Sequence, residues 1–236
     1  MQTGNAEALA ANYTAIKNYL LMGNERASDG AFVSTNPGNV QTDPADIIDW
    51  PAVERDGYAL SSSNSVSAVP NAFHYGNLRL MAKIASALGN TTDAADFANR
   101  ADRLQAVFSG SAFWNGSTYK DGEAVSHVSA HANFFALAMG AVPDARKTAV
   151  LDYLVTRRMP CSVYGAQYLL EALFEGGRED QAIGLMADND AAYVRSWSNM
   201  IRVGSTMTLE SWDASVKSNL DWNHAWGAAP ANLIPR

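Results

Sequence analysis

Residues 163–177, Val-Tyr-Gly-Ala-Gln-Tyr-Leu-Leu-Glu-Ala-Leu-Phe-Glu-Gly-Gly, contain the clearest folding signal in the chain. Their large apolar residues recur at spacings of three and four, which places one stripe on a single helix face: Leu169, Leu170, Leu173 and Phe174. Two glycines follow, and glycine is the usual residue at the end of a helix. The stretch therefore predicts a helix near residues 163–176 that packs against a core.

The same spacing recurs on both sides of this stretch. We expect further helices near residues 6–21, 71–88, 92–108, 129–140, 144–157, 179–187 and 190–201. Signals for β-strands are weak throughout. Short glycine-containing turns join helices into pairs, whereas long polar loops separate the pairs. This order predicts a mainly α fold of consecutive helical hairpins, an α/α toroid whose long loops converge on a pocket.

Length and composition indicate one domain over residues 1–236. The chain is 47% hydrophobic, which is enough to form a sizeable core. Its 17 basic and 24 acidic residues give a formal charge of −7, without any basic block. Nucleic acids and anionic membranes attract concentrated positive charge, so neither is an expected partner. A neutral substrate agrees with this balance.

Neither an export signal nor a membrane span is visible in the sequence as written. The first twenty residues lack a basic head with a long apolar run, and no later stretch is apolar over the length of a bilayer. We therefore expect a soluble, cytoplasmic protein, although a longer native chain could carry an export signal. Cys161 is the single cysteine, which excludes an internal disulfide and predicts a buried, inert thiol.

Residues 204–227 concentrate polar and aromatic side chains. Glu210 lies within Gly-Ser-Thr-Met-Thr-Leu-Glu-Ser-Trp-Asp, and His224 within Asp-Trp-Asn-His-Ala-Trp-Gly. Aromatic faces beside a carboxylate suit a neutral, polyhydroxylated ring, because the C–H face of a sugar packs on tryptophan while polar groups bind its hydroxyls. The alternative is that Trp212, Trp222 and Trp226 are core anchors and Glu210 is a solvated acid.

Three patches resemble the catalytic domain of the inverting α-L-rhamnosidases, glycoside hydrolases built on an (α/α)6 barrel. They are Ile-Asp-Trp-Pro with Arg-Asp-Gly-Tyr at residues 48–58, Cys-Ser-Val-Tyr-Gly-Ala-Gln-Tyr-Leu-Leu-Glu-Ala-Leu at 161–173, and the segment 204–227. They occur in the family's order along nearly the whole chain. The block around Glu210 is the most specific of the three.

The resemblance assigns roles to individual residues. It implies that Glu210 is the general base that activates the attacking water. It implies that Asp49 and Trp50 form an acid–tryptophan pair in the sugar pocket, and that His224 is a pocket histidine. Trp212 and Tyr164 become wall residues, and Asp56 belongs to a patch that holds the sugar. Arg55 either holds a sugar hydroxyl as well or pairs locally with Asp56. Inversion requires a second carboxyl group as general acid, roughly 6.5–9.5 Å from the base.

The chain departs from the family pattern in two ways. The acidic motif that carries the family's general acid is absent upstream of Asp49, and we expect seven or eight helices where six hairpins contain twelve. Both departures predict that this chain is the C-terminal two-thirds of the catalytic domain, with a missing N-terminal part or a partner chain completing the barrel. Glu54 and Asp56 are the local alternatives for the acid.

Neither a metal nor a cofactor is expected. His127 and His131 stand four residues apart, as metal ligands on a helix do, but no convincing third ligand accompanies them, and core or pocket-lining histidines are the alternative. Phosphate-binding, Ser-His-Asp and zinc motifs are absent from the sequence.

The sequence thus predicts a hydrolase that removes terminal α-L-rhamnosyl residues from rhamnose-containing glycosides. A non-catalytic fragment or sugar-binding module derived from the same domain is the alternative, and another six-hairpin glycosidase or a polysaccharide lyase is a third.

Overall fold

A computed structural model describes residues 6–20, 22–34, 47–59 and 65–235 of the chain. Within these ranges β-structure is confined to isolated bridges. The same ranges contain nine α-helices: α1 (Glu7–Asn18), α2 (Ala68–Ala87), α3 (Thr91–Ser109), α4 (Ala130–Ala138), α5 (Asp144–Leu154), α6 (Val163–Glu175), α7 (Glu179–Met186), α8 (Trp197–Arg202) and α9 (Ala229–Leu233). The mainly α prediction is confirmed.

Eight of these helices occur where the hydrophobic spacing predicts them. Two details differ. Helix α8 begins at Trp197 rather than near residue 190, because the intervening residues form turns that expose polar groups. Helix α9 was not predicted, so the expected count of seven or eight is one or two short for the described residues. A five-residue helix with Pro230 in its first turn is too short to show a period.

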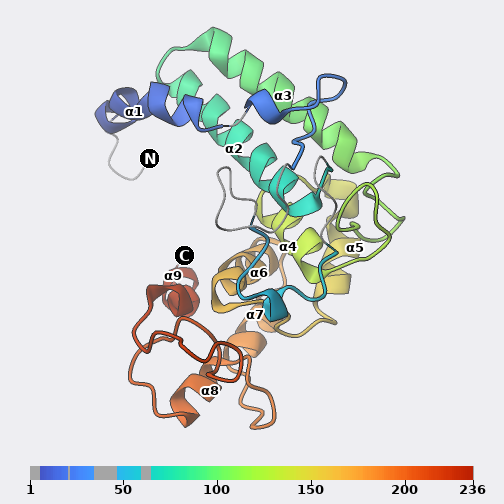
Figure 1. The fold of residues 1–236 in the computed structure, drawn as a ribbon. Helices are drawn as coiled ribbons and strands as arrows, with labels where there is room; N and C mark the ends of the chain where they lie inside the picture. The colour runs from blue at the N-terminus through green and yellow to red at the C-terminus, as the bar shows by residue number, and fades with distance from the viewer. Residues whose placement is uncertain (1–5, 21, 35–46, 60–64, 236) are drawn as a thin grey trace.

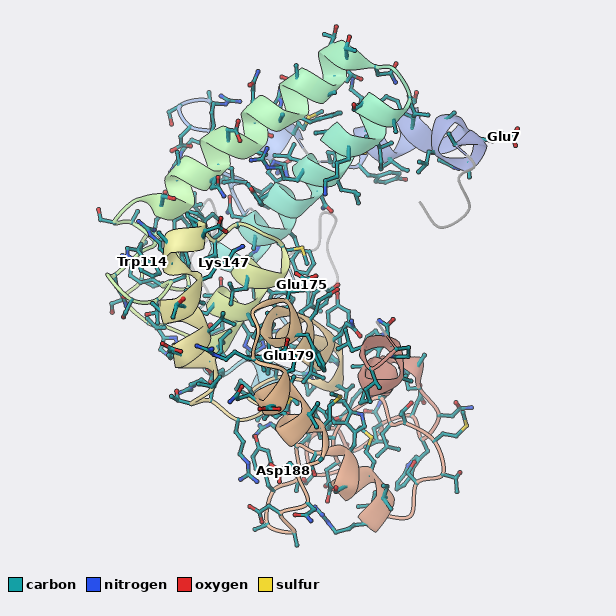
Figure 2. All side chains as sticks on the ribbon, turned by 180° about the vertical axis from the view of Figure 1, so that it is seen from behind. Glu7, Trp114, Lys147, Glu175, Glu179 and Asp188 are labelled. Carbon is teal, nitrogen blue, oxygen red and sulfur yellow. The ribbon has the colours of Figure 1, made fainter. Side chains whose placement is uncertain are left out.

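The helices form an open arc of two rows (Figure 1). Helices α2, α4, α6 and α9 pack against one another in sequence and form one row. Helices α3, α5 and α7 each pack against the preceding member of that row and form the second. Charged side chains such as Lys147 on α5 and Glu179 on α7 are exposed on this second row (Figure 2). This is the hairpin repeat of an α/α toroid.

One serine cap and one close contact fix the start of α6, which carries Tyr164. The Ser162 hydroxyl accepts hydrogen bonds from the N–H groups of Tyr164 and Gly165, both at 3.1 Å. A Cβ atom at Gly165 would lie 2.8 Å from an Asp49 carboxylate oxygen. Glycine at this position therefore lets the loop that carries Asp49 pack directly on the helix.

The core is continuous along the arc and includes the single cysteine. Cys161 is fully buried just before α6, and burial raises the pKa of its thiol well above the usual value. The thiol is therefore un-ionised at neutral pH, as the sequence predicted. The described helices include none that is long and apolar enough to cross a membrane.

Candidate active site

Backbone hydrogen bonds between two loop segments bring Glu210 and His224 together. The Glu210 N–H donates to the Asp221 carbonyl (3.0 Å), and the His224 N–H donates to the Thr208 carbonyl (2.8 Å). The Thr208 hydroxyl donates in turn to the His224 carbonyl (2.7 Å). Gly227 permits this approach, because a Cβ atom there would lie 2.8 Å from the Thr208 Cβ. The residues predicted as base and pocket histidine therefore share one surface.

The Glu210 carboxylate is anchored through one of its two oxygens. Its Oε2 accepts hydrogen bonds from the Lys217 ammonium group (2.8 Å) and from the Asp221 N–H (3.0 Å). Its Oε1 has no hydrogen-bond partner among the described residues. The contact with Lys217 is the main cause of a lowered Glu210 pKa, and the Asp221 N–H adds to it. Glu210 therefore stays ionised at lower pH than an ordinary glutamate.

Two exposed tryptophans lie in the segment that follows this carboxylate. Trp222 is 52% exposed and Trp226 is 44% exposed. The His224 ring meets Trp226 edge to face at 4.6 Å between centroids, and Trp226 lies 5.5 Å from the Tyr164 ring of α6. Trp226 and Tyr164 line a cavity of about 210 Å³ between α6 and α9. His224 joins this aromatic surface to the carboxylate, because its ring nitrogen lies within 4.8 Å of a Glu210 oxygen. Aromatic faces and a nearby carboxylate are features that suit sugar binding.

Trp212 differs from its two neighbours. Its side chain has no exposed surface and packs edge to face on Trp197, with 4.9 Å between ring centroids. Its indole N–H donates to the Cys161 carbonyl (2.7 Å). Trp212 therefore has no accessible surface with which to line the sugar pocket, which is the role that the resemblance implies. The structure instead makes it the anchor that fixes the Glu210 loop to the start of α6.

Asp49 is also enclosed by protein. Its side chain is 1% exposed, and its carboxylate accepts four hydrogen bonds. The donors are the Trp50 N–H (2.8 Å), the Ser162 N–H (3.0 Å), the Ser162 hydroxyl and the His131 Nε2 (2.8 Å). All four bonds lie within the protein, so Asp49 joins its loop to α4 and α6 rather than facing a ligand.

The other predicted residues of the 49–58 loop fall into two groups. Trp50 is exposed and is free to contact a ligand. Arg55 is buried and donates from Nε to the Asp49 carbonyl (2.8 Å), rather than pairing with Asp56. Asp56 accepts from the Ala130 N–H (2.8 Å) and from Arg157 (2.7 Å), which ties the loop to α4 and to the end of α5.

Glu54, a local alternative for the general acid, is fully buried. Its Oε2 accepts from Arg195 (2.7 Å), and its Oε1 has no hydrogen-bond partner in the described ranges of the chain. Burial raises the pKa of the Glu54 carboxyl despite the contact with Arg195. A raised pKa suits an acid, but this carboxyl has no exposed surface on the site that contains Glu210.

The two histidines considered as metal ligands pair with different aspartates. His127 pairs with Asp121 (2.6 Å), and His131 pairs with Asp49 (2.8 Å). Elsewhere, Glu210, Asp221 and His224 offer ligand atoms within 4.8 Å of one another. The Lys217 ammonium group already contacts that carboxylate, and a fixed positive charge opposes a metal ion there.

Comparison with known proteins gives the family of the chain. Residues 1–236 match the model of the bacterial alpha-L-rhamnosidase 6 hairpin glycosidase domain. The chain belongs to this family. No curated protein sequence matches the chain.

Solved rhamnosidase structures share the fold at low sequence identity. The alpha-L-rhamnosidase of Dictyoglumus thermophilum superimposes with a TM-score of 0.70 at 19% identity, over 99% of this chain and 25% of its own. A GH78 family rhamnosidase of Bacillus sp. GL1 superimposes with a TM-score of 0.75 at 21% identity, over 99% of this chain and 24% of its own. A Klebsiella oxytoca rhamnosidase with rhamnose bound has a TM-score of 0.71 at 18% identity, over 97% of this chain and 42% of its own. The chain thus spans about a quarter of the first two proteins.

The three patches that resemble this family are joined in space. The Asp49 carboxylate binds Ser162 at the start of α6, and the neighbouring Cys161 carbonyl binds the Trp212 indole. Trp212 lies two residues after Glu210. The first patch therefore supports the second, and the second supports the loop of the candidate base.

Sequence reasoning missed Lys217 and undervalued Trp226. Lys217 reaches Glu210 across a turn of seven residues, and no helical or strand period links the two positions. Trp226 contacts His224 and Tyr164, whereas Trp212 is buried. The signal for Trp226 was its place two residues after the histidine of the Asn-His motif.

Proposed function

We propose that this chain carries the catalytic base and part of the sugar pocket of a glycoside hydrolase that removes terminal α-L-rhamnosyl residues with inversion. The observation that carries the proposal is the Glu210 carboxylate, with Oε2 anchored by Lys217 and with Oε1 left without a hydrogen-bond partner among the described residues. His224, which packs on the exposed Trp226, lies close to this carboxylate. Family membership supports the class of reaction.

The two carboxylate oxygens of Glu210 have different roles: one holds the carboxylate in place and the other accepts the proton. Oε2 is fixed by Lys217 and the Asp221 N–H, which limits the rotation of the carboxylate. Oε1 accepts a proton from water as that water attacks the anomeric carbon, and the glycosidic C–O bond breaks on the opposite face. The contact with Lys217 lowers the pKa of Glu210, which keeps the base ionised in mildly acidic solution at some cost in basicity.

The sugar packs against aromatic faces. Trp222 and Trp226 present indole surface, and the Tyr164 ring continues that surface onto α6. Trp50 adds an exposed ring from the 49–58 loop. Rhamnose carries a methyl group in place of a hydroxymethyl group, so an apolar wall favours it over sugars with a 6-hydroxyl. His224 provides a polar ring nitrogen near Glu210.

The general acid comes from outside the described residues. Glu54 is buried against Arg195, and Asp56 is bound by Arg157 and by the Ala130 N–H. We propose that further helical hairpins, from a longer chain or a partner, bring the acid to within the distance that inversion requires.

Neither of the two local alternatives for the acid, Glu54 and Asp56, is free to protonate a leaving group, which also favours a second candidate, a sugar-binding module without turnover. Calorimetric titration with L-rhamnose separates the two. Saturable binding without hydrolysis of an aryl α-L-rhamnoside would support the module.

The primary test compares hydrolysis of p-nitrophenyl α-L-rhamnopyranoside by the parent and by Glu210→Gln, each completed with any further hairpins of the native protein. Glu179→Gln, on the exposed face of α7, is the matched control. We expect a loss of about 100-fold or more for Glu210→Gln and none for the control. Activity of Glu210→Gln within a few-fold of the parent would refute the role of Glu210.

A further inference from the structure

A group of polar side chains is enclosed beneath the 49–58 loop. Asp49, Glu54 and His131 are all buried, and Glu54 and His131 have no exposed surface. Buried polar atoms in proteins almost always have hydrogen-bond partners. The charged and titratable groups around Glu54 come from four segments: Asp49 and Arg55 from its own loop, His131 from α4, Cys161 from just before α6, and Arg195 from just before α8.

Two polar atoms of this group have no hydrogen-bond partner among the described residues. They are Glu54 Oε1 and His131 Nδ1. The charge of His131 acts on the Glu54 carboxyl, which places the two side chains in one neighbourhood. Because an unpaired buried polar atom is costly, an arrangement that pairs both atoms is strongly favoured.

Asp49 fixes which ring nitrogen of His131 carries a hydrogen. Its carboxylate accepts from the N–H groups of Trp50 and Ser162 and from the Ser162 hydroxyl. The Ser162 oxygen accepts from two N–H groups of α6, so its own O–H is free to donate. A carboxyl surrounded by donors favours its ionised form, which takes a further bond from His131 Nε2–H at 2.8 Å. Nδ1 of the neutral ring is then an acceptor.

Glu54 is bound by far fewer donors than Asp49. Arg195 Nε donates to Glu54 Oε2 at 2.7 Å, and no donor of the described residues reaches Oε1. In an ionised Glu54, Oε1 and His131 Nδ1 would be two buried acceptors without a donor. One proton on Oε1 makes it a donor to Nδ1, directly or through an enclosed water, and satisfies both atoms. An imidazolium beside an ionised Glu54 would instead bury two more charges.

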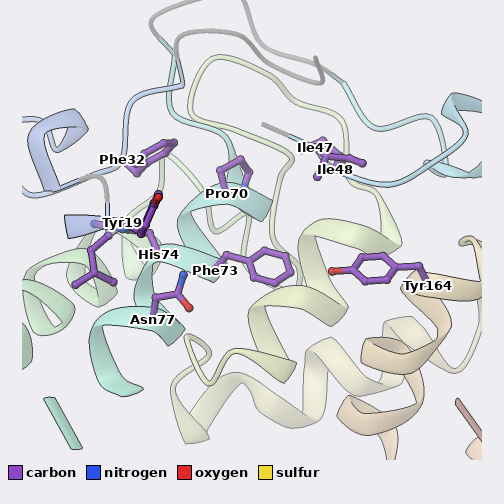
Figure 3. Close-up of a pocket in the computed structure, with 10 residues that line it drawn as sticks. Tyr19, Phe32, Ile47, Ile48, Pro70, Phe73, His74, Asn77 and Tyr164 are labelled. Carbon is purple, nitrogen blue, oxygen red and sulfur yellow. The ribbon is translucent and has the colours of Figure 1, made fainter. Parts of the chain in front are cut away.

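We propose that Glu54 is protonated on Oε1 at neutral pH and is a positioning residue for the exposed Trp50. Glu54 holds His131, and His131 holds the Asp49 carboxylate, which accepts from the Trp50 N–H at 2.8 Å. On the other side of Asp49, Ile48 lines a cavity of about 280 Å³ between α2 and α6 (Figure 3). The network therefore fixes a backbone segment that reaches accessible surface on both sides. The effect on ligand binding rests on the proposed function, whereas the protonation state does not.

The first test compares Glu54→Gln with Asp49→Asn by chemical denaturation. Glutamine has the shape of a protonated glutamate: its carbonyl oxygen accepts from Arg195, and its N–H donates toward His131. We expect the unfolding equilibrium constant of Glu54→Gln to stay within about tenfold of the parent, and that of Asp49→Asn to rise by more than about 100-fold. Glu54→Leu, which can form neither bond, should lose as much as Asp49→Asn. A similar loss in Glu54→Gln, or its failure to fold, would overturn the proposal.

Carbon-13 NMR measures the protonation state in the parent itself. In protein labelled at the glutamate side-chain carboxyls, one resonance should keep the chemical shift of an un-ionised carboxyl at neutral pH and be absent from Glu54→Gln. Glu25 and Glu210, whose pKa values are lowered by their cationic partners, give the ionised reference. A spectrum that contains only ionised glutamates would overturn the proposal.

The positioning role is tested by the pH dependence of L-rhamnose binding. Burial raises the pKa of Glu54, so the stabilisation from its protonated form is present in acid and is lost as pH rises through the raised pKa. Rhamnose affinity should therefore fall over that range in the parent but not in Glu54→Gln. Parallel pH profiles in the two proteins would overturn the positioning role. An absence of rhamnose binding at every pH would count against the proposed function, and the NMR spectrum would still decide the protonation state.

Discussion

The two loops that contain acid–tryptophan pairs differ in what surrounds the acid. In the 49–58 loop the Asp49 carboxylate is buried and accepts four protein hydrogen bonds. In the 204–227 segment one Glu210 oxygen has no hydrogen-bond partner within the part of the chain that the structure describes, and the same segment exposes Trp222 and Trp226. A carboxylate saturated by protein donors stabilises a fold, whereas a half-saturated one can accept a proton. The acid of the first loop thus stabilises the fold, whereas the acid of the second loop can take part in proton transfer.

The tryptophans show the same contrast in reverse. In the first loop Trp50 is exposed beside a buried acid, and in the second Trp212 is buried beside an accessible acid. Burial therefore divides the predicted sugar-binding residues into those that can contact a ligand and those that position them.

The largest expected effect comes from the two tryptophans of the Glu210 segment. Trp212→Ala removes a fully buried ring and its hydrogen bond to Cys161, and should lower the free energy of unfolding by about 3–5 kcal/mol. Trp226→Ala should cost less than about 1 kcal/mol and instead weaken L-rhamnose binding. Urea denaturation with calorimetry measures both quantities. An equal loss of unfolding free energy in the two variants would contradict the distinction between a buried anchor, Trp212, and an exposed ligand contact, Trp226.

Substitution of the buried acid, Asp49, should also destabilise the protein more than substitution of Glu210. Asp49→Asn leaves buried donors from Ser162 and His131 poorly matched, at an expected cost of about 3 kcal/mol in the free energy of unfolding. Glu210→Gln should change stability by less than about 1 kcal/mol, because its contacts are near the surface. Chemical denaturation at neutral pH tests this, and an Asp49→Asn variant as stable as Glu210→Gln would contradict it.

A smaller effect is expected where Gly227 approaches the Thr208–Leu209 backbone. Gly227→Ala places a methyl group 2.8 Å from the Thr208 Cβ and 3.0 Å from the Leu209 carbonyl oxygen, and should cost about 1–3 kcal/mol. It should also weaken rhamnose binding by separating His224 from Glu210. Gly184→Ala, with open space around it on α7, is the control and should be neutral or slightly stabilising. Thermal denaturation compares the two.

The smallest expected effect is on pH dependence. Lys217 lowers the Glu210 pKa, so the ionised base, and the modest stabilisation from the pair, are present above the ordinary glutamate pKa and are lost as pH falls through the lowered one. Lys217→Met should therefore move the acidic limb of kcat/KM to higher pH, while Lys217→Arg keeps it near the parent. A carbon-13 titration of the Glu210 carboxyl must show the same direction of shift, and an unchanged titration would disprove the role of Lys217.

The helices were predictable from the sequence, and the assignment of individual side chains was less so. Spacing located eight helices because each buries one stripe, but it is silent on loops, where Trp212 and Trp226 look alike. Ser162 and His131 as partners of Asp49, and Lys217 as the partner of Glu210, depend on contacts between distant segments. Resemblance to the family predicted one site for Glu210 and His224, and the structure brings these two side chains together. It could not distinguish exposed residues from those buried beneath them.

Hydrolysis of α-L-rhamnosyl fluoride by this chain tests the central claim most directly, because fluoride leaves without a proton from a general acid. The parent should release fluoride and first form the β-anomer of L-rhamnose, observed by proton NMR, and Glu210→Gln should be at least about 100-fold slower. A folded parent without turnover, a retained anomeric configuration, or a Glu210→Gln variant as fast as the parent would contradict the assignment of Glu210 as the base.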